Sequence, residues 1–69
     1  MKNKIQLLEE QAKYLSELPE QGMGYQIVDV FLKNGKVLKQ RVVLNSTFLM
    51  LQENEHILVS DILKIELAQ

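Results

Sequence analysis

Residues 25–44 read YQIVDVFLKNGKVLKQRVVL and carry the strongest structural signal in this chain of 69 residues. The segments on either side of the central Asn34-Gly35 pair are rich in β-branched and aromatic residues, which is typical of strands. Asn-Gly favours a type I′ hairpin turn, because both central residues of that turn need positive φ. The stretch therefore predicts a β-hairpin with strands at 25–32 and 37–44.

The sequence after this hairpin predicts three more short strands, at 47–51, 56–59 and 63–67. Asn45-Ser46 is expected to form a tight turn, and residues 52–55 a further turn. Ser60-Asp61 breaks the apolar pattern and predicts a single 3₁₀ turn in which Asp61 caps free backbone N–H groups. Because a flat sheet of five short strands would leave exposed edges and an uncovered apolar face, we expect closure into a barrel. The predicted fold class is mainly β: a small five-stranded antiparallel barrel with an N-terminal α-helix.

The segment before the hairpin predicts a helix over 2–18. Five apolar residues recur there at spacings of three or four and share one helical stripe. They are Ile5, Leu8, Ala12, Leu15 and Leu18. Asn3 is expected to cap the helix together with Gln6, and Pro19 to end it. The stripe would pack on its own barrel or bind a partner, and residues 1–69 would form one domain with the barrel at 25–67.

Composition narrows the class of protein. The chain has 46% hydrophobic residues, a net charge of -1, no Cys and one His, so disulfides are impossible and a structural zinc site is not expected. No apolar run is long enough for a transmembrane helix, and an acidic pair interrupts the N-terminal apolar run, which argues against a signal peptide. We therefore expect a cytoplasmic protein that does not associate with a membrane. We expect it to bind neither a metal nor a cofactor. A chain this short buries only about 60% of its unfolded surface, which favours a homo-oligomer.

The layout resembles the Sm-like family of small β-barrels (LSm/Hfq-like). Three segments carry the resemblance: the strand–Asn-Gly–strand unit at 30–38, the apolar run 48–51 followed by Asn54, and the segment 57–62. An SH3-like barrel has the same pattern and stays an alternative. Sm-like proteins commonly have Gly in the bent second strand, where this chain has Gln40 or Arg41.

The resemblance implies a ring of six or seven subunits, in which the fourth strand of one subunit pairs with the fifth of the next. Four apolar residues of these two predicted strands are the candidates for an oligomer interface: Ile57, Val59, Leu63 and Ile65. Hfq-like proteins carry a Lys-His pair before the last strand that contacts uridine-rich RNA. Ser60-Asp61 stands at that place here, and an Asp there would repel phosphate.

A basic cluster within residues 33–41 is the candidate nucleic-acid surface, with Tyr25 as a candidate for stacking on a base. Its members are Lys33, Lys36, Lys39 and Arg41. Strand alternation puts Lys39 and Arg41 on one face. The alternative is a solvated hairpin tip and an edge strand protected by charge.

Other polar and aromatic residues have structural interpretations. Phe31 and Phe48 are expected in the core or at an interface, and His56 on the surface. Asp29 would face solvent or pair with Lys39 or Arg41 across the hairpin. No nucleophile–base pair or carboxylate dyad stands out, so we do not expect an enzyme.

The sequence thus predicts a non-enzymatic, oligomeric binding or assembly module of unknown ligand. The alternative is an Sm-like ring that binds single-stranded RNA or DNA through its basic strand face. A third possibility is an accessory domain bound to a larger enzyme.

Overall fold

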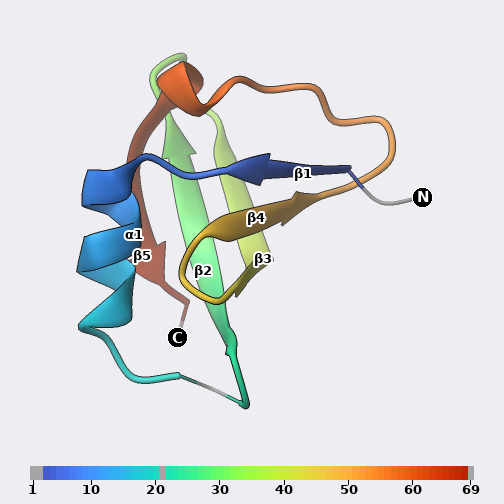
Figure 1. Cartoon of the computed structure of the whole chain (residues 1–69). Coiled ribbons are helices and arrows are strands. Elements are labelled where there is room, and N and C mark those ends of the chain that lie inside the picture. The colour runs from blue at the N-terminus through green and yellow to red at the C-terminus, as the bar shows by residue number, and fades with distance from the viewer. Residues whose placement is uncertain (1–2, 21, 69) are drawn as a thin grey trace.

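The computed structural model describes residues 3–20 and 22–68, and Lys2 and Gln21 of the predicted helix and loop lie outside this description. Within it, five antiparallel strands form one sheet in the order β1-β4-β3-β2-β5, with one short helix (Figure 1). The elements are β1 (Asn3–Gln6), α1 (Glu9–Ser16), β2 (Tyr25–Leu32), β3 (Val37–Leu44), β4 (Phe48–Leu51), the 3₁₀ turn η1 (Val59–Asp61) and β5 (Ile62–Leu67). The mainly β class is confirmed. The sheet is not closed by pairing, because β1 and β5 each have one strand neighbour.

The central hairpin has the predicted strands but a different turn. β2 and β3 coincide with the predicted ranges 25–32 and 37–44. Only Gly35 has positive φ, at 93°, and Asn34 does not, so the turn is not type I′. The Gly35 N–H bonds to the Leu32 carbonyl at 3.0 Å and the Leu32 N–H to the Lys36 carbonyl at 2.8 Å. This pattern closes a three-residue loop with glycine in the left-handed position.

The turn between β3 and β4 has the geometry expected for the other hairpin. Asn45 and Ser46 both have positive φ, at 52° and 59°, and the Thr47 N–H bonds to the Leu44 carbonyl at 2.9 Å. This is the predicted tight turn, with the two positive φ angles of type I′. β4 begins at Phe48, one residue after the predicted start.

The predicted helix over 2–18 is wrong in its first part, because Asn3–Gln6 forms the strand β1. β1 pairs antiparallel with β4, with Ile5 opposite Leu49. The polar–apolar alternation of these residues suits a strand as well as a helical stripe, and the unpaired edge of β4 supplies backbone hydrogen bonds. Asn3 does not cap a helix. Its Nδ2 donates to the Glu53 carbonyl at 3.1 Å, and to those of Gln52 and Glu55 at 3.4 Å each.

The helix itself is short, and a side chain covers each of its ends: Gln11 of its own first turn and Gln26 of β2. The Leu8 N–H donates to Gln11 Oε1 at 2.9 Å in front of the first turn. At the other end, the buried Gln26 of β2 donates from Nε2 to the Leu15 carbonyl at 2.8 Å. The helix ends at Ser16, before Pro19. The predicted apolar stripe included Leu8, but Leu8 is half exposed and its neighbour Leu7 is buried instead. The stripe is therefore kept only within α1.

The predicted strand 56–59 is absent. The chain runs from β4 past β1 without strand pairing, and then turns through η1 into β5 (Figure 1). Asp61 has the predicted capping role, since its Oδ2 accepts the Leu58 N–H at 2.9 Å. The 3₁₀ turn therefore lies where it was expected, and the fifth strand of the sheet is β1 instead.

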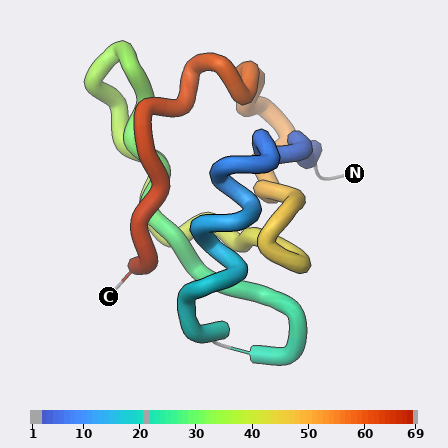
Figure 2. The backbone as a smooth tube through the Cα atoms, turned by 60° about the vertical axis from the view of Figure 1, so that its left-hand side comes forward, coloured from blue at the N-terminus to red at the C-terminus, as the bar shows by residue number. Residues whose placement is uncertain are grey.

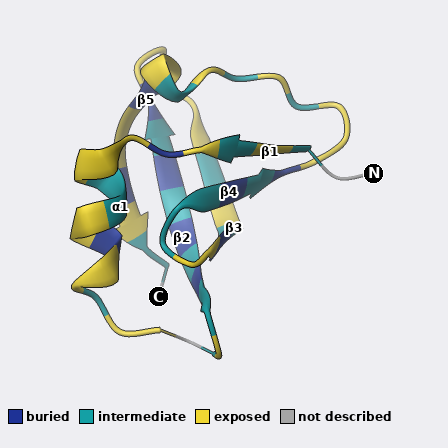
Figure 3. Cartoon of the chain, viewed as in Figure 1, coloured by how far each residue is buried: buried dark blue, intermediate teal, exposed yellow. Residues whose placement is uncertain are grey.

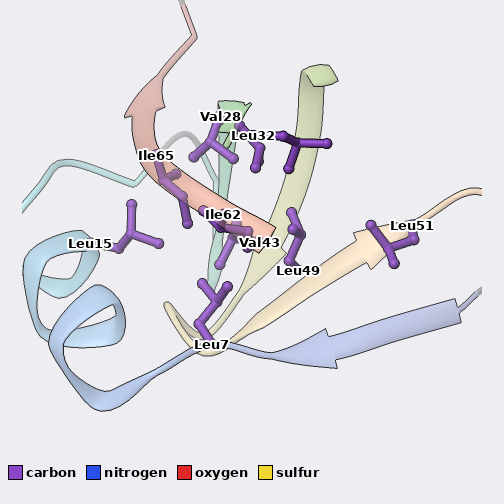
Figure 4. Packing of buried hydrophobic residues seen from close by; sticks show 10 residues of the cluster. Leu7, Leu15, Val28, Leu32, Val43, Leu49, Leu51, Ile62 and Ile65 are labelled. Carbon is purple, nitrogen blue, oxygen red and sulfur yellow. The ribbon is translucent and has the colours of Figure 1, made fainter. Parts of the chain in front are cut away.

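The core lies on one side of the bent sheet, beneath α1. Buried and half-buried residues alternate along β2 (Figure 3), so its Gln26, Val28, Val30 and Leu32 face inward. Leu15 of α1 is fully buried and lies near Ile65 of β5 (Figure 4). Among the described residues, no helix is long and apolar enough to cross a membrane.

Candidate functional site

Three of the four candidate basic residues are exposed around the β2–β3 hairpin. Lys33, Lys36 and Lys39 are all exposed, and none of them is in an ion pair within the described part of the chain. The Lys33 N–H donates to the Asp61 carbonyl at 2.9 Å, which holds η1 against the hairpin. The hairpin therefore presents three exposed lysines, two in its loop and one on β3.

Arg41 differs from these lysines, because its guanidinium forms an ion pair with Glu55. Its Nη1 and Nη2 donate to the two carboxylate oxygens of Glu55 at 2.9 and 2.6 Å. Both side chains are only 15% and 17% exposed. A bidentate pair at this depth uses both ends of the guanidinium. The positive charge of Arg41 thus holds the 52–55 loop onto β3.

A β-bulge puts Lys39 and Arg41 on opposite faces, so the prediction of a shared face is wrong. Val28 lies opposite Arg41 and Val30 opposite Leu38, so β3 has one more residue than β2 between these pairs. Because both valines face the core, Arg41 and Leu38 do as well, and Lys39 faces away. Gln40 takes up the extra residue with a φ of 56°.

Asp29 stabilises this bulge and forms no ion pair with a basic side chain among the described residues. Its Oδ1 accepts the backbone N–H of Gln40 at 3.0 Å. Asp29 is half-buried on the outer face of β2. Of the two interpretations made from the sequence, the solvent-facing position agrees with this outer-face placement, and pairing with Lys39 or Arg41 is wrong, because the carboxylate accepts a backbone N–H. The bend in β3 lies at the place where Sm-like proteins commonly have Gly.

Tyr25 is half-buried at the start of β2. A Cβ atom on Gly22 would lie 2.0 Å from a ring carbon of Tyr25, so the ring packs directly over this glycine. One side of the aromatic ring is therefore covered by the chain. The structure does not bring Tyr25 together with the lysines, since Tyr25 and the Lys33–Lys36 loop lie at opposite ends of β2.

Phe31 and Phe48 lie on the outer face of the sheet, where they are half-buried. The Nζ atoms of Lys64 and Lys4 lie 4.8 Å from the ring centres of Phe31 and Phe48, respectively. Each lysine neighbours its ring across a strand pair of β5–β2 or β1–β4. These cation–π contacts cover the rings in part. The prediction of a core position is wrong, and the prediction of an interface position is not tested.

The second candidate surface is the free edge of β5. A groove of about 320 Å³ runs between this strand and α1. Its lining comes from one face of the helix and the start of β5: Glu10, Gln11, Tyr14, Leu63, Lys64, Ile65 and Glu66. Leu63 is 63% exposed and Tyr14 48% exposed. A strand edge beside exposed apolar side chains is a surface suited to pairing with another chain.

The four predicted interface residues are placed in different surroundings. Leu63 is exposed beside the groove, whereas Ile65 is buried in the core of its own chain. Ile57 and Val59 are partly buried against that core. The structure therefore brings only Leu63 to an open surface. The role of Tyr14 was not predicted from the sequence, because its place beside β5 depends on how α1 packs.

His56 is exposed, as predicted. Among the described residues, no group of three or more His, Cys, Asp or Glu side chains could hold a metal ion. Comparison of the chain with protein-family models, with curated proteins and with solved structures gives no match. The Sm-like resemblance therefore stays a prediction.

Proposed function

We propose that this chain is a non-enzymatic assembly module that forms a homo-oligomer through an open edge of its sheet. The observation that carries the proposal is the free edge of β5, which lies beside a groove and the exposed Leu63 and Tyr14. Exposed sheet edges pair readily with other strands, and soluble proteins usually protect them. The small size of the domain is a second reason to expect a partner chain.

We infer that the bent sheet is a small barrel of the Sm-like or SH3-like kind. β5 returns beside β2 after a single 3₁₀ turn, and β1 and β4 run across the direction of β2 and β3 (Figure 1). The left-handed Gln40 supports the Sm-like choice, because it bends β3 where that family commonly has glycine. β1 stands in the place expected for the fourth strand, which distinguishes this chain from the family layout.

The proposed function is tested by the mass of the native protein, measured by light scattering during size exclusion over a range of concentrations. We expect a mass of at least two chains of 8.0 kDa at high concentration. A mass of one chain at every concentration up to about 1 mM would contradict self-assembly, because functional homo-oligomers normally form well below this concentration.

A second candidate function is binding of single-stranded RNA or DNA through the hairpin. The three exposed lysines at 33, 36 and 39 favour it, and oligomerisation would multiply their charge. Its test is the salt dependence of binding to labelled oligo-U and oligo-A. Replacing Lys33 and Lys36 by Glu should weaken binding and flatten the salt slope. Arg41 is unsuitable for this test, because its charge holds Glu55.

A further inference from the structure

The backbone of β5 has unused hydrogen-bonding groups on its free side. The Ala68 N–H donates to the Ile27 carbonyl at 2.9 Å, so Ala68 faces β2. In an antiparallel strand, residues that face the partner alternate with residues that face away. Glu66 and Lys64 therefore face β2 with their backbone groups, and Ile65 and Leu67 present theirs to the free edge.

The sequence of β5 is self-complementary. Residues 63–67 read Leu-Lys-Ile-Glu-Leu, and they have the same pattern in both directions except that Lys and Glu exchange places. If two copies pair antiparallel with Ile65 opposite Ile65, Lys64 of each copy lies opposite Glu66 of the other. Leu63 lies before the regular part of the strand, because the β2–β5 register shifts between the pairs Leu32–Ile62 and Phe31–Lys64.

We propose that the partner at this edge is a second copy of the chain, bound across a twofold axis at Ile65, and this inference rests on the proposed assembly function. The two β5 strands then join the two sheets into one. Ile65 has its N–H and C=O on the free side, so the central pair exchanges both hydrogen bonds. The Lys64–Glu66 pairs fall at the closer, non-hydrogen-bonded positions, where opposite charges interact most strongly.

The charges on the outer face favour this occupant. Across the β2–β5 pair, Glu66 lies opposite Asp29, which is a like-charged cross-strand neighbour. Its own Lys64 reaches it at 3.0 Å, and both side chains are about half exposed, at 55% and 52%. A second lysine, from the other copy, would lie on the free side of Glu66 and offset the repulsion from Asp29.

The same charges select the register. Because β-strand side chains alternate with a period of two, a pairing centred on Lys64 would place Lys64 opposite Lys64, and one centred on Glu66 would place the two carboxylates together. Of these three registers, only the one centred on Ile65 makes both charge pairs attractive.

The groove beside β5 can take the apolar side chains of the second strand. Figure 2 shows β5 at one side of the molecule, beside α1. Leu63 and Tyr14 line the space of about 320 Å³ between them. In the pair of chains, the added strand runs along the free edge of β5, beside Leu63 at this groove. Leu63, which is 63% exposed in the single chain, thereby loses contact with water.

Charge exchange at residues 64 and 66 tests the pairing. Glu66→Lys places a lysine opposite Asp29 within the chain and opposite Lys64 across the twofold axis. We expect its melting temperature to be unchanged or higher, while its dimerisation constant, from sedimentation equilibrium, weakens roughly tenfold or more. The double variant Lys64→Glu with Glu66→Lys should dimerise like the original chain. Equal amounts of the Lys64→Glu and Glu66→Lys single variants should form a mixed dimer, although neither pairs with itself.

The outcomes separate this interface from the assembly function. If the original chain assembles and Glu66→Lys assembles equally well, the β5 pairing is overturned while self-assembly stands. If the original chain stays monomeric, both proposals fail. If Glu66→Lys is monomeric but the double variant and the mixture do not recover, the register centred on Ile65 is overturned. Should Lys64→Glu fail to fold, Glu66→Lys and the double variant still give a decision.

Discussion

Gln40 has a backbone conformation that glutamine rarely adopts. It has a φ of 56°, and its N–H is held by Asp29. The left-handed region costs a non-glycine residue about 1 kcal/mol, and glycine adopts it freely. We expect Gln40→Gly to raise the free energy of unfolding by about 0.5 kcal/mol, measured by urea denaturation. Lys39→Gly, at the neighbouring position of ordinary φ, should lower it by a similar amount. Equal losses in both variants would contradict the bulge.

Arg41 and Glu55 form the most buried ion pair of the described residues, and their effect is on stability. Glu55 also accepts the Gln52 N–H at 2.9 Å, so this carboxylate organises the 52–55 loop. Arg41→Met would leave a half-buried carboxylate without its partner, at a cost of about 2 kcal/mol in the free energy of unfolding. Lys39→Met is the matched control on the same strand, with an expected change within about 0.5 kcal/mol. A loss in the control as large as that in Arg41→Met would remove this role from the ion pair.

Among the elements, the β2–β3 hairpin depends on one glycine. Gly35 has a φ of 93°, and no atom lies within 4 Å of where its Cβ would be, so strain and not collision limits substitution. We expect Gly35→Val to destabilise the fold by about 2 kcal/mol, because β-branched residues rarely adopt positive φ. Gly35→Asn should be milder, since Asn tolerates this region. Thermal denaturation measures both, and an unchanged melting temperature in Gly35→Val would contradict the three-residue loop.

The whole molecule behaves as one cooperative unit if α1 and the sheet share a core. Leu15 is completely buried, whereas Leu58 is 68% exposed. Leu15→Ala should cost about 3 kcal/mol, from a total stability of roughly 3–10 kcal/mol for a domain of this length. The same truncation at Leu58 should cost little. Coincident changes in circular dichroism and tyrosine fluorescence would show loss of the helix and the sheet together. A helix that melts separately would contradict a shared core.

The strands closest to strong turn signals could be predicted from the sequence. β2 and β3 have the expected bounds, and β4 and β5 begin within one residue of theirs. Alternation and turn residues act over a few positions, so local sequence contains enough information for these elements. The same reasoning predicted that the lysines of the hairpin lie on the surface and that Asp61 caps the 3₁₀ turn.

The remainder depended on partners that lie far away along the chain. Asn3–Gln6 is a strand because the edge of β4 accepts it, and Arg41 is an ion-pair residue because the loop brings Glu55 to it. The bulge at Gln40 reversed the face expected for Arg41, since one extra residue shifts the alternation. The sequence alone therefore determined the local strands, the turns and the self-complementary pattern of β5. The tertiary structure alone determined which edges are covered, which charges are paired and which edge stays open, because each of these requires contacts between distant segments.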